Sequence, residues 1–187
     1  MLMIDEVLKD AEGRMKKSVE ALGRDLAGMR TGRASAALVE HVSVDYYGTP
    51  TPLNQLATIT VPDARLIAVQ AWDKGAVASI EKAILKSPLG LNPSNDGNLI
   101  RIPIPPLTEE RRRELVKVVR RRVEEGKVAV RNVRRDALEH LRALEKEKKV
   151  SQDADRKAQE RLQALTDSSV AQVEKLASQK EAELMEV

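Results

Sequence analysis

The sequence predicts an α+β protein, in which an elongated three-helix bundle is interrupted by a small mixed α/β domain. Both ends of the chain carry apolar residues at steps of three and four, the spacing of amphipathic helices. The middle is rich in β-forming residues and turn signals. Charged residues make up 33% of the 187 residues and aromatic residues only 2%, a composition typical of long solvated helices. We expect residues 1–30 and 106–187 to form the bundle and residues 31–105 the inserted domain.

Each predicted helix of the bundle has one apolar stripe. No long helix can bury such a stripe alone, so the three helices should pack together. The first stripe is Ile4, Leu8, Ala11, Met15, Val19, Leu22, Leu26 and Met29. The second is Val116, Val119, Val123, Gly126, Val130, Val133, Ala137, Leu141 and Leu144, with Gly126 as its weak point. The third is Ala158, Leu162, Leu165, Val173, Leu176 and Leu184, loosened around Ser169 and Val170.

Capping residues mark where the second and third helices begin. Thr108 and Ser151 can accept hydrogen bonds from the free N–H groups of a first helical turn. Asp153 and Asp155 follow Ser151 and suit the positive end of a helix, so we interpret them as a helix start rather than a metal site. A helix of some forty residues would be about 60 Å long.

The inserted domain has its own pattern of short elements. We expect strands at residues 42–47, 58–61, 66–72 and 100–104. Val77, Ile80, Ile84 and Leu85 predict one short amphipathic helix, and turn signals occupy residues 47–52 and 87–97.

The chain crosses between the two domains twice. Prolines on the returning segment restrict φ and keep the following helix from extending backward. Two short links with little shared core favour hinge motion. The predicted hinge consists of Thr31, Gly32, Arg33, Pro103, Pro105 and Pro106.

Positive charge is concentrated in one stretch of a chain whose net charge is only +3. Residues 111–135 contain eleven Lys or Arg against three Glu, whereas residues 136–187 contain nine against twelve acidic residues. Such a distribution indicates a localised polyanion site, although a solvated helix face is an equal alternative. Because aromatic residues are scarce, nucleic acid would be bound through its phosphates rather than by stacking.

The arginines of the second helix are expected to form a ridge beside its apolar stripe. On a helical wheel centred on Val130, Lys127 and Arg134 lie next to the stripe and Arg131 slightly further round. Fixed guanidinium groups can bind phosphate with two parallel hydrogen bonds. The alternative is that these cations pair with acids on neighbouring helices. The candidate RNA-binding residues are Arg30, Lys127, Arg131, Asn132, Arg134 and Arg135.

Enzymatic chemistry finds little support in the sequence. There is no Cys, His41 and His140 are isolated, and no glycine-rich phosphate loop or paired-His metal motif occurs. We therefore expect no enzyme, no cofactor and no metal. No apolar run approaches the ~20 residues that span a bilayer, and no signal peptide is evident, so a cytoplasmic protein without membrane contact is expected.

Six short blocks of the sequence are informative when they are taken together. They are Arg30–Ser35 (RTGRAS), Tyr46–Ala57 (YYGTPTPLNQLA), Leu89–Pro93 (LGLNP), Pro105–Arg112 (PPLTEERR), Val128–Ala137 (VAVRNVRRDA) and Lys180–Met185 (KEAELM). One such block alone would be a weak signal, but six in this order and at this chain length are specific. They resemble the bacterial ribosome recycling factor family along nearly the whole chain.

The resemblance implies an L-shaped arrangement of the bundle and a β/α/β domain, and a monomer. It implies a non-enzymatic factor that splits post-termination ribosomes into subunits with elongation factor G and GTP. The bundle would contact large-subunit rRNA, with Arg30, Arg131 and Arg134 at the family's motif positions. The inserted domain would face elongation factor G and the small subunit. The alternatives are a generic helical RNA- or DNA-binding protein and a coiled-coil adaptor.

Overall fold

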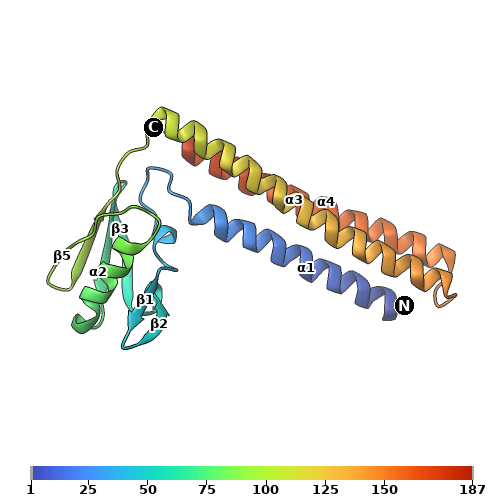
Figure 1. The fold of residues 1–187 in the computed structure, drawn as a ribbon. Coiled ribbons are helices and arrows are strands. Elements are labelled where there is room, and N and C mark those ends of the chain that lie inside the picture. Colours follow the sequence, from blue (N-terminus) through green and yellow to red (C-terminus); the bar gives the residue numbers. More distant parts are fainter. Residues whose placement is uncertain (1, 187) are drawn as a thin grey trace. The chain divides into compact units, whose positions relative to one another are not determined.

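The computed structural model describes residues 2–186 and divides the chain into two compact units, Met1–Leu26 with Arg113–Val187, and Ala27–Arg112. The first unit is a bundle of three long helices, coloured blue, yellow-orange and red in Figure 1. They are α1 (Leu2–Ala27), α3 (Glu109–Lys146) and α4 (Gln152–Met185). The α+β class and the interrupted three-helix bundle are confirmed.

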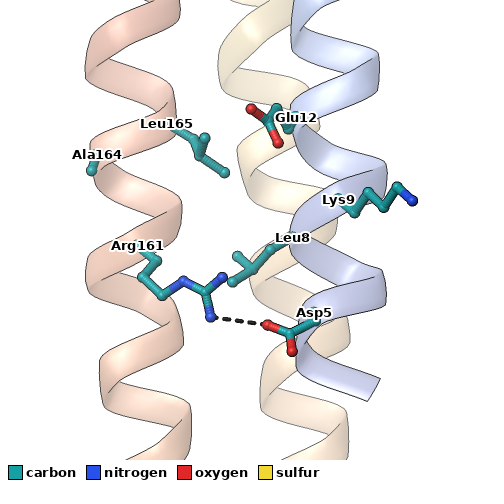
Figure 2. Close-up of a pocket in the computed structure, with 7 residues that line it drawn as sticks. All are labelled: Asp5, Leu8, Lys9, Glu12, Arg161, Ala164 and Leu165. Carbon is teal, nitrogen blue, oxygen red and sulfur yellow. Dashed lines mark hydrogen bonds and ion pairs between the residues drawn. The ribbon is translucent and has the colours of Figure 1, made fainter. Parts of the chain in front are cut away.

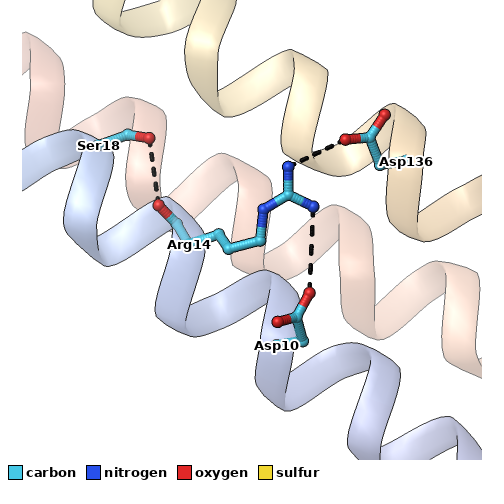
Figure 3. Close-up of polar contacts among 4 residues, drawn as sticks. All are labelled: Asp10, Arg14, Ser18 and Asp136. Atoms are coloured by element: carbon cyan, nitrogen blue, oxygen red, sulfur yellow. Dashed lines mark hydrogen bonds and ion pairs between the residues drawn. The ribbon is translucent and has the colours of Figure 1, made fainter.

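Ion pairs fix the direction in which the helices run. Arg14 Nη2 lies 3.0 Å from Asp136 Oδ2 of α3, and Arg122 Nη1 lies 3.5 Å from Asp25 Oδ2, so α1 and α3 are antiparallel. Figure 3 shows Arg14 between Asp136 and Asp10 of its own helix. These side chains are about half exposed, so the ion pairs contribute little to stability, but they show how α1 and α3 are aligned.

Helix α4 runs parallel to α1 and antiparallel to α3. Arg161 Nη1 lies 3.0 Å from Asp5 Oδ1 near the start of α1. Near the end of α1, a Cβ on Gly23 would lie 3.8 Å from Leu176 Cδ1. The chain reverses between α3 and α4 within a few residues, where Lys148 has a positive φ of 56°.

The predicted apolar stripes are largely confirmed as the bundle core. All predicted stripe residues of α1 from Ile4 to Leu26 are buried. In α3, Leu115 is buried where Val116 was expected, because the stripe drifts around the helix near its start. Leu144 is only half-buried.

The expected stripe of α4 is partly wrong. Leu165 and Leu176 are half-buried, whereas Thr166 and Lys180 occupy buried positions. The Thr166 hydroxyl donates to the Leu162 carbonyl oxygen at 2.9 Å, and Lys180 Nζ lies 3.3 Å from Glu183 Oε2. Their polar atoms are therefore satisfied locally, which lets polar residues continue an apolar face.

Both predicted helix caps are confirmed. Thr108 Oγ1 accepts from the Arg111 N–H at 3.2 Å, and Ser151 Oγ accepts from the Ala154 N–H at 3.1 Å. A hydrogen bond from Lys157, followed by its charge, holds the pKa of Asp153 below its usual value. The Ser151 cap agrees with the predicted start of a helix at this point.

The second unit contains two antiparallel sheets and one longer helix. Strands β1 (Ser43–Tyr46) and β2 (Thr49–Pro52) form one sheet, and the order of the other is β3-β4-β6-β5. The four strands are β3 (Ala57–Asp63), β4 (Leu66–Ala71), β5 (Ser94–Asp96) and β6 (Leu99–Pro103). Helix α2 is Val77–Lys86, and three short 3-10 helices are η1 (Ala36–Leu38), η2 (Leu53–Gln55) and η3 (Lys74–Ala76). The core of this unit lies between the sheets and α2, and includes Val44, Ile67, Ile80 and Ile100.

Two short strands were predicted as turns. In β2, Pro50 and Pro52 lack an N–H, but a strand in a two-stranded sheet has one free edge on which proline is tolerated. Strand β5 is three exposed residues long, too short for a periodic signal. Leu85 was predicted on the buried face of α2, but is 58% exposed.

Both chain crossings are attached to the turn between β3 and β4. The Ala34 N–H donates to the Ala64 carbonyl at 2.7 Å, and the Ile104 N–H donates to the Arg65 carbonyl at 2.8 Å. Gly32 has a left-handed φ of 79°, and a Cβ there would lie 3.3 Å from the backbone N of Leu107. The outgoing and returning segments are therefore neighbours.

A carboxylate joins the β1–β2 turn to η3. Asp73 Oδ1 accepts from the Gly75 N–H at 2.8 Å, and Oδ2 accepts from the hydroxyls of Tyr46 at 3.0 Å and Tyr47 at 3.3 Å. These hydrogen bonds lower the pKa of Asp73, with the largest effect from the Gly75 N–H and the next largest from the Tyr46 hydroxyl. Tyr47 itself has a left-handed φ of 49° beside Gly48 at 83°, as in two-residue hairpin turns.

This network predicts a pH-dependent effect of Asp73→Asn. Because the folded pKa lies below the ordinary 3.8, the ionised carboxylate stabilises the fold at neutral pH. That contribution is lost as the pH falls through the folded pKa. Urea unfolding should show the variant less stable than the parent at neutral pH, with the difference shrinking below pH 3.8. An equal difference at neutral and acidic pH would contradict the role of ionisation.

Candidate nucleic-acid interface

Three of the predicted RNA-binding residues, Lys127, Arg131 and Arg134, lie on the flank of α3 that faces α4. Lys127 and Arg134 are half-buried there, and Arg131 is more exposed. Asn132 and Arg135 are also exposed. Arg30 belongs to the other unit, where it is half-buried.

Some of the basic residues on this flank pair with acids, as the alternative interpretation expected. Lys127 Nζ lies 3.3 Å from Glu174 Oε1, and its side chain is only 21% exposed. Arg120 Nε donates to Glu181 Oε1 at 3.0 Å. Both pairs join α3 to α4, and that of Lys127 is the less exposed on its cationic side.

Arg134 and Arg131 differ from these paired cations. Within residues 2–186, Arg134 makes no hydrogen bond or ion pair, although it is half-buried. Arg131 Nη1 lies 3.4 Å from Glu124 Oε1 of its own helix, and both side chains are more than half exposed. Such a pair is weak in water and easily exchanged for a phosphate. The structure thus leaves two arginines available on one flank.

These two arginines line a groove between α3 and α4 with a volume of about 460 Å³. The groove was not predicted from the sequence, although its α4 wall follows helical spacing along one flank of that helix. The α4 residues that line it are Gln163, Thr166, Asp167, Val170, Ala171 and Glu174. Among the described residues that line the groove, Glu174 is paired with Lys127, whereas Asp167 makes no ion pair. Asp167 Oδ1 accepts from Gln163 Nε2 at 2.8 Å.

A second groove lies between α1 and α4 and has a different character (Figure 2). Its volume is about 600 Å³, and Leu8 and Leu165 give it apolar surface. Arg161 reaches across it to Asp5, whereas the Lys9 side chain extends away from α4. Its cations and acids are balanced in number, so it offers no concentrated positive charge.

His41 and His140, the isolated histidines, are both exposed. Among residues 2–186, no three His, Cys, Asp or Glu side chains gather in a way that could hold a metal ion. In the same part of the chain, no helix is long and apolar enough to cross a membrane.

Comparisons with known proteins agree on one family. The family model described as ribosome recycling factor matches residues 22–185. The ribosome-recycling factor of Thermomicrobium roseum is 60% identical over 185 residues, covering 99% of this chain and 100% of that protein. A solution structure of a ribosome recycling factor superposes with a TM-score of 0.82 at 49% identity, covering 98% of both chains.

A further solved structure contains a relative bound to a post-termination complex. It comprises models for the T. thermophilus ribosome recycling factor and the E. coli elongation factor G bound to the E. coli post-termination complex. This chain matches it with a TM-score of 0.71 at 50% identity, covering 98% of this chain and 99% of that one. With a family match over most of its length and relatives of this identity, the chain belongs to the ribosome recycling factor family.

Proposed function

We propose that this protein, with elongation factor G and GTP, splits post-termination ribosomes into subunits, and that its bundle binds large-subunit rRNA through Arg131 and Arg134. The observation that supports the rRNA site most directly is Arg134. A guanidinium that is half-buried and has no partner within residues 2–186 is held in place by packing, yet free to bind an anion.

The neighbouring contacts give each predicted residue a distinct role. Lys127 is engaged with Glu174, so it stabilises the groove and adds positive potential there. Asn132 and Arg135 are exposed and supply peripheral contacts. Arg30, in the second unit, is proposed as a separate rRNA contact at the family's motif position.

The inserted unit is proposed to face elongation factor G and the small subunit, and to move on a hinge. The Ala34 and Ile104 hydrogen bonds anchor both crossings to the β3–β4 turn, so motion is restricted to segments outside these anchors. Thr31, Gly32 and Arg33 precede one anchor, and Pro105 and Pro106 follow the other. Pro103 lies inside β6 and is held by the sheet.

Light scattering of post-termination ribosomes tests the function. Scattering should fall only when this protein, elongation factor G and GTP are all present, because dissociation into subunits reduces the mean particle mass.

The Gly32→Val variant tests the proposed hinge in the same assay. It should split ribosomes more slowly, because the left-handed φ of residue 32 and the nearby Leu107 both oppose a side chain there. Gly90→Val, at a left-handed glycine with nothing within 4 Å, is the control for backbone strain alone.

The outcomes separate the alternative functions. Binding to large subunits without splitting would indicate a generic RNA-binding protein. The absence of ribosome binding would indicate an adaptor. A fall in scattering without elongation factor G or without GTP would contradict the proposed mechanism.

A further inference from the structure

The groove between α3 and α4 presents different chemistry on its two walls. The α3 wall carries the hydrogen-bond donors of Arg131 and Arg134. The α4 wall carries the acceptor Asp167, of which Oδ1 is hydrogen-bonded to Gln163 and Oδ2 makes no hydrogen bond within residues 2–186. Val170 and Ala171 provide apolar surface between the polar groups. A site for phosphate alone would gain nothing from a free carboxylate, because like charges repel.

We propose that this groove binds a guanine base from an unpaired stretch of the RNA, an inference that rests on the proposed rRNA-binding function. Arginine forms two hydrogen bonds with the O6 and N7 acceptors of guanine. The N1–H and 2-amino donors lie on the adjacent edge of the same base, where a carboxylate accepts from both. A groove with arginines on one wall and a carboxylate on the other matches these two edges.

The other bases fit this arrangement less well. Adenine presents an amino donor beside N7, where the arginines need acceptors, and its N1 is an acceptor that a carboxylate repels. Uracil has no amino group to donate to the carboxylate. Cytosine has its amino donor and its acceptors on the same edge, so it cannot offer acceptors to one wall and donors to the other. The volume of about 460 Å³ accommodates a single purine nucleotide. RNA recognition of this kind reads splayed-out bases in loops, and here it uses base edges rather than aromatic stacking.

Nucleotide titration of the full chain, followed by NMR, tests this assignment. GMP should shift the signals of Arg131, Arg134, Asp167 and Val170, with an affinity about 10-fold or more above that of AMP, CMP or UMP. Ribose 5-phosphate measures the contribution of phosphate. 7-Deaza-GMP lacks N7 and tests the arginine wall, and IMP lacks the 2-amino group and tests the carboxylate wall.

Asp167→Asn gives the decisive comparison, because two interpretations predict opposite signs. If the groove binds guanine, the variant binds GMP more weakly and loses the preference over AMP. If it binds only phosphate, removing a negative charge strengthens binding of all four nucleotides, which would overturn the proposal. Glu160→Gln is the matched control, since Glu160 is exposed on α4 and has no partner among the described residues.

Failure of this inference is distinguishable from failure of the proposed function. If wild-type protein splits ribosomes but shows no GMP preference, or no shifts in the groove at millimolar GMP, only the guanine assignment is wrong. If it neither binds nor splits ribosomes, the proposed function is wrong whatever the nucleotide titration shows. Circular dichroism of both variants excludes loss of fold as the cause of weaker binding.

Discussion

Replacing both Arg131 and Arg134 by Glu is expected to weaken binding to large ribosomal subunits by on the order of 100-fold or more. Hydrogen bonds to charged groups contribute about 1.5–3 kcal/mol each, and every 1.4 kcal/mol corresponds to about tenfold in affinity. Charge reversal also places two carboxylates against the polyanionic RNA. Of the two single variants, Arg134→Glu should have the larger effect, because Arg131 already shares its charge with Glu124.

The salt dependence of binding should change together with the affinity. Positive charge near the RNA backbone displaces counterions, and each phosphate neutralised in this way steepens the fall of log affinity with log salt by about 0.7–0.9. Reversing two charges removes part of this effect. Filter binding or sedimentation of the factor with large subunits at several salt concentrations gives both quantities. The double variant should therefore show a flatter dependence as well as weaker binding.

Arg24→Glu is the matched control for this experiment. Arg24 is exposed near the end of α1 and makes no ion pair within the described part of the chain. Its reversal changes net charge as much as either single variant does. If Arg24→Glu weakened binding as strongly as Arg134→Glu, affinity would follow net charge rather than the α3 ridge, and our placement of the site would be wrong.

Periodicity predicted the bundle because each long helix must bury one face. It assigned Ile4 through Leu26 to the core correctly, since these are all apolar. It missed Thr166 and Lys180, because a pattern of apolar residues cannot include buried positions that carry polar side chains. The hydrogen bond of Thr166 and the ion pair of Lys180 within α4 can be recognised only once the helix register is known.

Only one wall of the proposed site could be predicted from the sequence. The arginines of α3 stand out as a local excess of charge, whereas Gln163 and Asp167 belong to a helix whose composition is acidic and unremarkable for a solvated face. Which flank of α4 meets α3 depends on the packing of all three helices. Sequence patterns could therefore single out Arg131 and Arg134 as candidates but could not show that they line one groove with Asp167.

Gly126→Leu is expected to lower the free energy of unfolding by about 3 kcal/mol, because overpacking of a buried contact usually costs about 1–3 kcal/mol and a whole side chain must be displaced. A Cβ at Gly126 would lie 3.0 Å from Leu22 Cδ2 and 3.7 Å from its Cγ. Leu22 is only 5% exposed and has little room to move. The glycine therefore lets α1 and α3 approach closely, although it weakens the helix that contains it.

Gly13→Leu makes the same chemical change in a helix where nothing lies within 4 Å of the added Cβ. It should stabilise the protein by up to about 1 kcal/mol, because leucine favours a helix over glycine. Urea unfolding followed by circular dichroism would thus give opposite signs for two glycine-to-leucine changes. If both variants were stabilised, the gain in helix propensity would exceed the cost of the contact with Leu22. In that case α1 and α3 could move apart at residue 126 without a large loss of packing.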